Sequence, residues 1–185
     1  MVRGMKLLLV DGHYYVYRSY FAIRELTNAL VGSPCAIFGF VKTVRRMLKD
    51  LSPDLGAVVW DEGLSARRME LQPRYKQQRE EMPEAMRVQL DCIRGMVPAL
   101  GLASVGIEGM EADDVLASYA VAARGKGIEV VLATNDKDLF QLVGDGVSVY
   151  STAKTDLTGP GDAFALLGAE AVRAKWGVEP GQIGD

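Results

Sequence analysis

The sequence predicts an α/β domain with a mostly parallel central sheet and helices on both faces. Short apolar runs alternate with segments of helical periodicity along the 185 residues, and the strongest runs lack polar alternation. Strands buried on both faces have this pattern, and parallel strands need crossover connections that are usually helices. The length suits one domain with a full hydrophobic core, so residues 1–185 are predicted to form a single unit.

The predicted strands are short, and the strong ones end beside acidic residues. Residues 6–10, 55–60 and 128–133 are strong apolar runs, whereas 103–105 and 147–150 are weaker. Asp11 and Asp61 directly follow the first two, and Asp136 and Asp138 follow the third. Ligands of open α/β sheets bind beyond the carboxyl ends of the strands, so these four acids are expected to share one crevice.

Segments whose apolar residues recur three or four apart are predicted helices. They span residues 14–30, 36–51, 83–100, 111–123, 139–143 and 165–176, the last ending at Gly177. Tyr17 and Phe21 are expected in the core, while the position of Tyr14 stays open. His13, the only histidine, is interpreted as a locally hydrogen-bonded turn residue rather than a catalytic base.

Composition favours an ordinary globular protein of a reducing compartment. Cys35 and Cys92 match no metal or redox spacing and are expected to be buried free thiols. The apolar run near the N-terminus is too short for a signal peptide, and no stretch approaches the roughly 20 residues that span a bilayer. We expect a soluble, cytoplasmic monomer without membrane contact.

Acidic residues form the main candidate site. Glu111, Asp113 and Asp114 open a predicted helix, and the first and third share a face. Taken singly, each acid has a structural explanation, because acidic residues are favoured in the first turn of a helix and aspartate is common in turns after strands. Carboxylates gathered in one cleft would repel each other, whereas hard divalent cations require oxygen ligands. The predicted metal ligands are Asp11, Asp61, Glu111, Asp113, Asp114, Asp136 and Asp138.

The proposed ions are two Mg²⁺, with Mn²⁺ as an alternative, in an arrangement suited to hydrolysing phosphodiesters. The net charge of −3 argues against nucleic acid, but these seven acids account for it. Residues 67–79 carry five basic side chains and one acid, and could contact phosphates. A solvated charged face is the alternative reading of that segment.

The chain resembles the 5′-nuclease domain family of bacterial DNA polymerase I and its stand-alone exonuclease and flap endonuclease relatives. The resemblance rests on residues 8–13, Tyr17-Arg18, the stretch 61–79, and the segments 111–114 and 134–139. It implies a PIN-like 5′-nuclease core in which the acids bind two magnesium ions. It also implies catalytic roles for Lys76 and Arg79, and DNA binding by Arg18, Arg68, Tyr75, Lys76 and Arg79.

From this resemblance, the expected function is divalent-metal-dependent 5′-3′ exonuclease or flap endonuclease cleavage of DNA near 5′ ends, at junctions of single and double strands. The resemblance also implies that the single strand passes a helical gateway built from about residues 74–100. A non-catalytic nucleic-acid-binding module and an acidic-site ribonuclease are the alternatives.

Three departures from the family matter. The chain ends at Asp185, before the family's helix-hairpin-helix part and further aspartates, so weak turnover is expected. Residues 155–165 look like an insertion, and Trp60 stands where phenylalanine is more usual.

Overall fold

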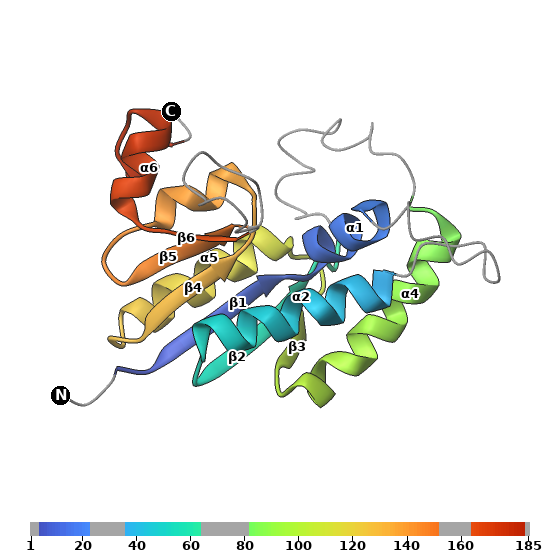
Figure 1. The fold of residues 1–185 in the computed structure, drawn as a ribbon. Coiled ribbons are helices and arrows are strands. Elements are labelled where there is room, and N and C mark those ends of the chain that lie inside the picture. Colours follow the sequence, from blue (N-terminus) through green and yellow to red (C-terminus); the bar gives the residue numbers. More distant parts are fainter. Residues whose placement is uncertain (1–3, 23–35, 64–81, 152–163, 184–185) are drawn as a thin grey trace. The chain divides into compact units, whose positions relative to one another are not determined.

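The computed structural model describes residues 4–22, 36–63, 82–151 and 164–183 (Figure 1). The predictions for Cys35, the basic segment 67–79 and the insertion 155–165 lie wholly or mostly outside these residues. The chain divides into two compact units, which are described separately. Unit 1 comprises Met1–Asp11, Pro53–Ala57 and Asp113–Asp185, and unit 2 comprises Gly12–Ser52 and Val58–Ala112.

Six strands form a sheet in the order β3-β2-β1-β4-β5-β6. They are β1 Lys6–Asp11, β2 Leu55–Trp60, β3 Ala103–Gly106, β4 Glu129–Ala133, β5 Val147–Ser151 and β6 Ala165–Leu167. Strand β4 pairs in parallel with both β1 and β5, whereas β6 pairs antiparallel with β5. The α/β class and the mostly parallel sheet are confirmed, and β6 makes the sheet mixed.

Five α-helices and three short 3₁₀ helices are present in the described residues. They are α1 Gly12–Ala22, α2 Ala36–Leu51, α4 Glu84–Met96, η2 Val97–Leu100, α5 Ala112–Arg124, η3 Lys137–Leu142, α6 Ala169–Trp176 and η4 Pro180–Gln182. The predicted ranges 36–51, 83–100 and 111–123 match these elements closely. None of the helices in the described ranges is long and apolar enough to cross a membrane.

The core of unit 1 is built from strands with no exposed apolar face. Leu8, Leu9 and Val10 of β1 are fully buried, as is Leu132 of β4. Because both faces of these strands are covered, their sequences read as continuous apolar runs, which is why they could be predicted. In unit 2, α2 packs against α1 and α4 through one apolar stripe: Ala36, Phe40, Val44, Met47 and Leu51.

The expected single helix over residues 165–176 is wrong at its start. Ala165–Leu167 forms β6, with Leu167 opposite Val149 of β5. Gly168 then takes an extended conformation as the N-cap of α6, and the helix ends at the left-handed Gly177 (φ 72°), as predicted. The strand depends on pairing with a distant segment, which helical periodicity does not reveal.

Two core assignments are also wrong. The buried face of α1 carries Tyr15, Val16 and Tyr20, whereas Phe21 is 44% exposed and Tyr17 is half-buried. Tyrosine occurs both in protein cores and on surfaces, so the spacing of the aromatic residues did not reveal which face of α1 is buried.

Cys92 is a free thiol but is exposed. The buried stripe of α4 consists of Met86, Leu90 and Ile93. Cys92 is two residues from Leu90, and two residues correspond to about 200° of helical rotation, which turns the thiol away from that stripe.

Candidate metal centre

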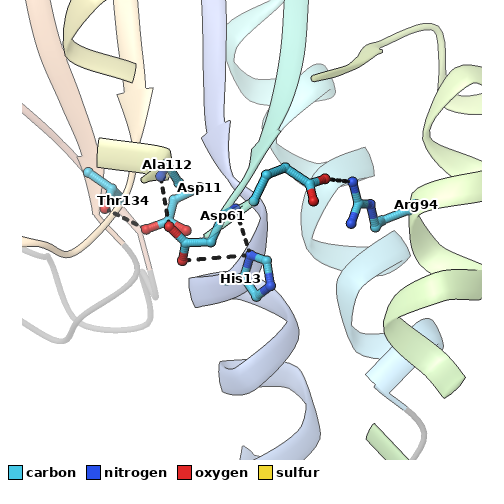
Figure 2. A network of polar contacts seen from close by, with 7 residues as sticks. Asp11, His13, Asp61, Arg94, Ala112 and Thr134 are labelled. Atoms are coloured by element: carbon cyan, nitrogen blue, oxygen red, sulfur yellow. Dashed lines mark hydrogen bonds and ion pairs between the residues drawn. The ribbon is translucent and has the colours of Figure 1, made fainter. Parts of the chain in front are cut away.

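Asp11 is a buried carboxylate at the end of β1, and Thr134 holds it in place. Val10 pairs with Ala133 across the parallel strands, so the next residue of each chain segment lies at the same carboxyl edge. The Thr134 hydroxyl donates to Oδ2 of Asp11 at 3.3 Å (Figure 2). Asp11 is 8% exposed and Thr134 is fully buried. Strand register therefore brings these two side chains together.

Thr134 also connects Asp11 to the turn that follows β4. Its hydroxyl oxygen accepts the backbone N–H of Asp136 at 3.1 Å. The Asp136 carboxylate in turn accepts the N–H of Asp138 at 2.9 Å and caps η3. One hydroxyl thus fixes both a candidate ligand and the backbone of a second one.

Thr134→Val should lower the free energy of unfolding by about 1–3 kcal/mol. Valine keeps the shape of threonine but removes one hydrogen bond to Asp11 and one from the N–H of Asp136, at a fully buried position. Thr134→Ser retains the hydroxyl and should lose less. Urea unfolding followed by circular dichroism measures both variants, and equal stability of Thr134→Val and wild type would contradict the bridging role.

Asp61, in unit 2, follows β2 and is held on both its backbone and its side chain (Figure 2). Its N–H donates to Nδ1 of His13 at 3.1 Å, and its Oδ1 accepts the N–H of Ala112 at 2.7 Å. Ala112 is the first residue of α5, where backbone N–H groups lack helical acceptors. The Asp61 side chain is 34% exposed. It is therefore fixed in orientation while remaining accessible.

The backbone around Glu111 is held by hydrogen bonds to the residues next to Asp61. The N–H of Glu62 donates to the carbonyl of Met110, and the N–H of Gly109 donates to the carbonyl of Glu62. Together with the Ala112 contact, these bonds fix the backbone on both sides of Glu111. Glu111 itself is 1% exposed. The end of β2 and the start of α5 are thus joined around two acidic residues.

Trp60 supports this end of β2 from inside unit 2. Its ring is fully buried, stacks with Phe40 at 6.2 Å between ring centroids, and meets His13 edge-on at 5.8 Å. Nε1 donates to the Ser104 hydroxyl at 2.9 Å, and the Arg94 guanidinium lies 5.5 Å from the ring centroid. Arg94 also forms an ion pair with Glu62. The residues flanking Asp61 are therefore closely packed.

Gly12→Ala should destabilise the protein by about 1–3 kcal/mol, the usual cost of overpacking a core. A Cβ at Gly12 would overlap ring atoms Cε3 and Cζ3 of Trp60, a rigid side chain that has no exposed surface into which to move. Gly95→Ala in α4 is the matched control, because its Cβ would have no neighbour within 4 Å. Thermal melting should show a loss for the first variant and none for the second.

The predicted ligands divide between the units. Asp61 and Glu111 belong to unit 2, and the other five belong to unit 1. Asp113 and Asp114 are half-buried in the first turn of α5, and Asp138 is exposed. Within the ranges that the structure describes, no three His, Cys, Asp or Glu side chains form a metal-binding group. The shared site of seven carboxylates stays a prediction.

Of the residues predicted to contact DNA, the structure describes only Arg18. Arg18 is exposed on α1. Arg68, Tyr75, Lys76 and Arg79 lie outside the described residues.

The donor chemistry fits a hard divalent cation. The candidate ligands offer carboxylate oxygens, which magnesium and manganese prefer. Burying carboxylates such as Asp11 and Glu111 costs free energy unless positive charge compensates them. A divalent ion is one source of such charge.

Three supporting residues were not identified from the sequence. His13 was expected to bond locally, yet its partner Asp61 lies 48 residues away. Thr134 and Trp60 stood beside predicted ligands without an assigned role. The position of Thr134, directly after a strand and two residues before Asp136, is the signal that could have identified it, since hydroxyls often accept the N–H two residues on.

The family of 5′-3′ exonuclease N-terminal, resolvase-like domains matches residues 6–177. A DNA polymerase I from Chloroflexus aurantiacus is 37% identical over 182 residues, which cover 97% of this chain and 19% of the polymerase. A 5′-3′ exonuclease from Aquifex aeolicus is 32% identical over 179 residues, which cover 97% of this chain and 59% of that protein. The chain thus spans about a fifth of the first relative and under two thirds of the second.

A solved structure is similar as well. The flap endonuclease of bacteriophage T5, in a pseudo-enzyme-product complex with DNA and metal ions, superposes with a TM-score of 0.59 at 26% identity. The match covers 79% of this chain and 54% of the phage protein.

Proposed function

This chain belongs to the 5′-3′ exonuclease N-terminal domain family, and we propose that it is the core of a magnesium-dependent 5′-nuclease that cleaves DNA at 5′ ends or flaps. The observation that carries the proposal is the burial of Asp11 at the carboxyl edge of β1, with its orientation set by Thr134. A carboxylate kept there at an energetic cost suits cation binding better than a role in stability.

The seven carboxylates Asp11, Asp61, Glu111, Asp113, Asp114, Asp136 and Asp138 are the proposed ligands. Bound Mg²⁺ would supply the charge that activates water and stabilises the leaving oxygen of the phosphodiester. Thr134 orients Asp11, and the Ala112 N–H orients Asp61, so each of these carboxylates has a fixed orientation within its own unit. Relatives that are named as exonucleases or bound to DNA and metal ions support this assignment.

Four basic residues and one tyrosine would bind the DNA. Lys76 and Arg79 would stabilise charge on the scissile phosphate, and Arg18, Arg68 and Tyr75 would engage the 5′ strand. The phosphate contacts predict binding that weakens steeply as salt rises.

Incubation with a 5′-labelled flap DNA tests the function. Cleavage should require Mg²⁺, stop with excess EDTA, and fall sharply in Asp113→Asn and Lys76→Ala. Asp145→Asn, at an exposed position in the turn before β5 and outside the proposed site and gateway, is the control and should cleave normally. Cleavage that persists in both site variants would overturn the assignment, and Mg²⁺-independent binding without any cleavage would favour a non-catalytic DNA-binding module.

A further inference from the structure

We infer that His13 is a positioning residue that sets the orientation of Asp61 for metal binding; this inference rests on the proposed function. The relevant atom is Nδ1, which accepts the backbone N–H of Asp61 at 3.1 Å. An imidazole nitrogen that accepts a hydrogen bond carries no proton, so the proton of the neutral ring is on Nε2.

His13 also approaches the Asp61 carboxylate. Nδ1 lies 3.9 Å from Oδ2 of Asp61, which is beyond hydrogen-bond distance. The bond to the Asp61 backbone decides the geometry. His13 therefore acts on the main chain of Asp61, whose side chain is 34% exposed.

The ring of His13 is itself held firmly. It lies in the first turn of α1, its side chain is 17% exposed, and it meets the buried Trp60 ring edge-on at 5.8 Å. A ring fixed in this way presents Nδ1 in a constant direction. Asp61 is then held at two points, His13 on its N–H and Ala112 on its Oδ1, which leaves its carboxylate little rotational freedom.

Groups that orient metal ligands commonly contribute about 10–100-fold in metal affinity. Loss of the Nδ1 acceptor should therefore raise the Mn²⁺ concentration at half-saturation by about that factor, without removing any ligand. The amide oxygen of asparagine can take the position of Nδ1, whereas that of glutamine reaches toward the position of Nε2. The Asn and Gln variants are both polar but place their acceptor oxygens at different positions. Comparing them therefore tests whether the position of the acceptor matters.

The test is Mn²⁺ titration of wild type, His13→Asn, His13→Gln and His13→Leu, followed by electron paramagnetic resonance of the free ion. His13→Gln and His13→Leu should bind about 10–100-fold more weakly, and His13→Asn should stay within about threefold of wild type. Circular dichroism checks that each variant is folded, and the Asn and Gln pair decides the question if the leucine variant does not fold.

Three outcomes would overturn the inference. Equal half-saturation of wild type and His13→Gln would show that Nδ1 does not position Asp61. An Asn variant as weak as the Gln variant would show that an acceptor at this place is not what matters. Absence of Mn²⁺ binding by wild type would instead remove the proposed function, and the positioning role with it.

Discussion

Asp11→Asn is expected to reduce Mg²⁺-dependent cleavage of a 5′-flap DNA by about a hundredfold or more. The substitution preserves shape but removes one negative charge from the proposed metal site, a change worth several kcal/mol when a cation organises the reaction. Asparagine still accepts from the Thr134 hydroxyl through its amide oxygen, so the local hydrogen bond is retained. Cleavage rates at saturating DNA over a range of Mg²⁺ concentrations measure the effect.

The stability of Asp11→Asn separates a functional role from a structural one. A buried carboxylate is costly without its cation, so in EDTA the free energy of unfolding should stay the same or rise. Asp145→Asn is the matched control in unit 1, since Asp145 is exposed and asparagine tolerates its positive φ of 46°. If Asp11→Asn cleaved normally but unfolded more easily, Asp11 would be a structural residue.

Trp60→Ala should lower the free energy of unfolding by about 3–5 kcal/mol, as is usual when a large aromatic ring is removed from a core. The cavity would lie between Phe40, His13 and the Arg94 guanidinium, and the Ser104 hydroxyl would lose its donor. Urea unfolding measured by circular dichroism gives the value. A loss below about 1 kcal/mol would show that the ring is not a central packing element.

Trp60→Phe tests the hydrogen bond apart from the packing. Phenylalanine retains an aromatic ring but no donor for Ser104, so part of the stability should be lost. In a double-mutant cycle with Ser104→Ala, the two changes should couple by about 1 kcal/mol. Strictly additive effects would indicate that the Nε1 contact contributes nothing to stability.

The sequence predicted elements whose burial is uniform. Strands β1, β2 and β4 end in stretches that are buried on both faces, so their continuous apolar runs indicate buried strands. Helix α2 has a single apolar stripe, so its periodicity indicates a helix with one buried face. β6 escaped prediction because its three residues gain their conformation by pairing with β5. The buried face of α1 was misassigned because its tyrosines suit both core and surface.

For the candidate site, the sequence likewise showed only local features. Asp11 and Asp61 could be selected as candidates because each acid stands next to a predicted buried strand. Their supports could not, since the partners Thr134 and His13 are 123 and 48 residues away from them. Strand register brings Thr134 to Asp11, whereas His13 reaches Asp61 from helix α1, and both arrangements exist only in the folded chain.

Diffraction from crystals grown with Mn²⁺ tests whether these carboxylates bind metal, because anomalous scattering locates the ion without reference to activity. We expect anomalous density within ligand distance of carboxylate oxygens of Asp11 and of other members of the set of seven, and its loss around residue 11 in Asp11→Asn. Bound Mn²⁺ that touches none of these carboxylates, in crystals of a protein that still cleaves flap DNA, would contradict it.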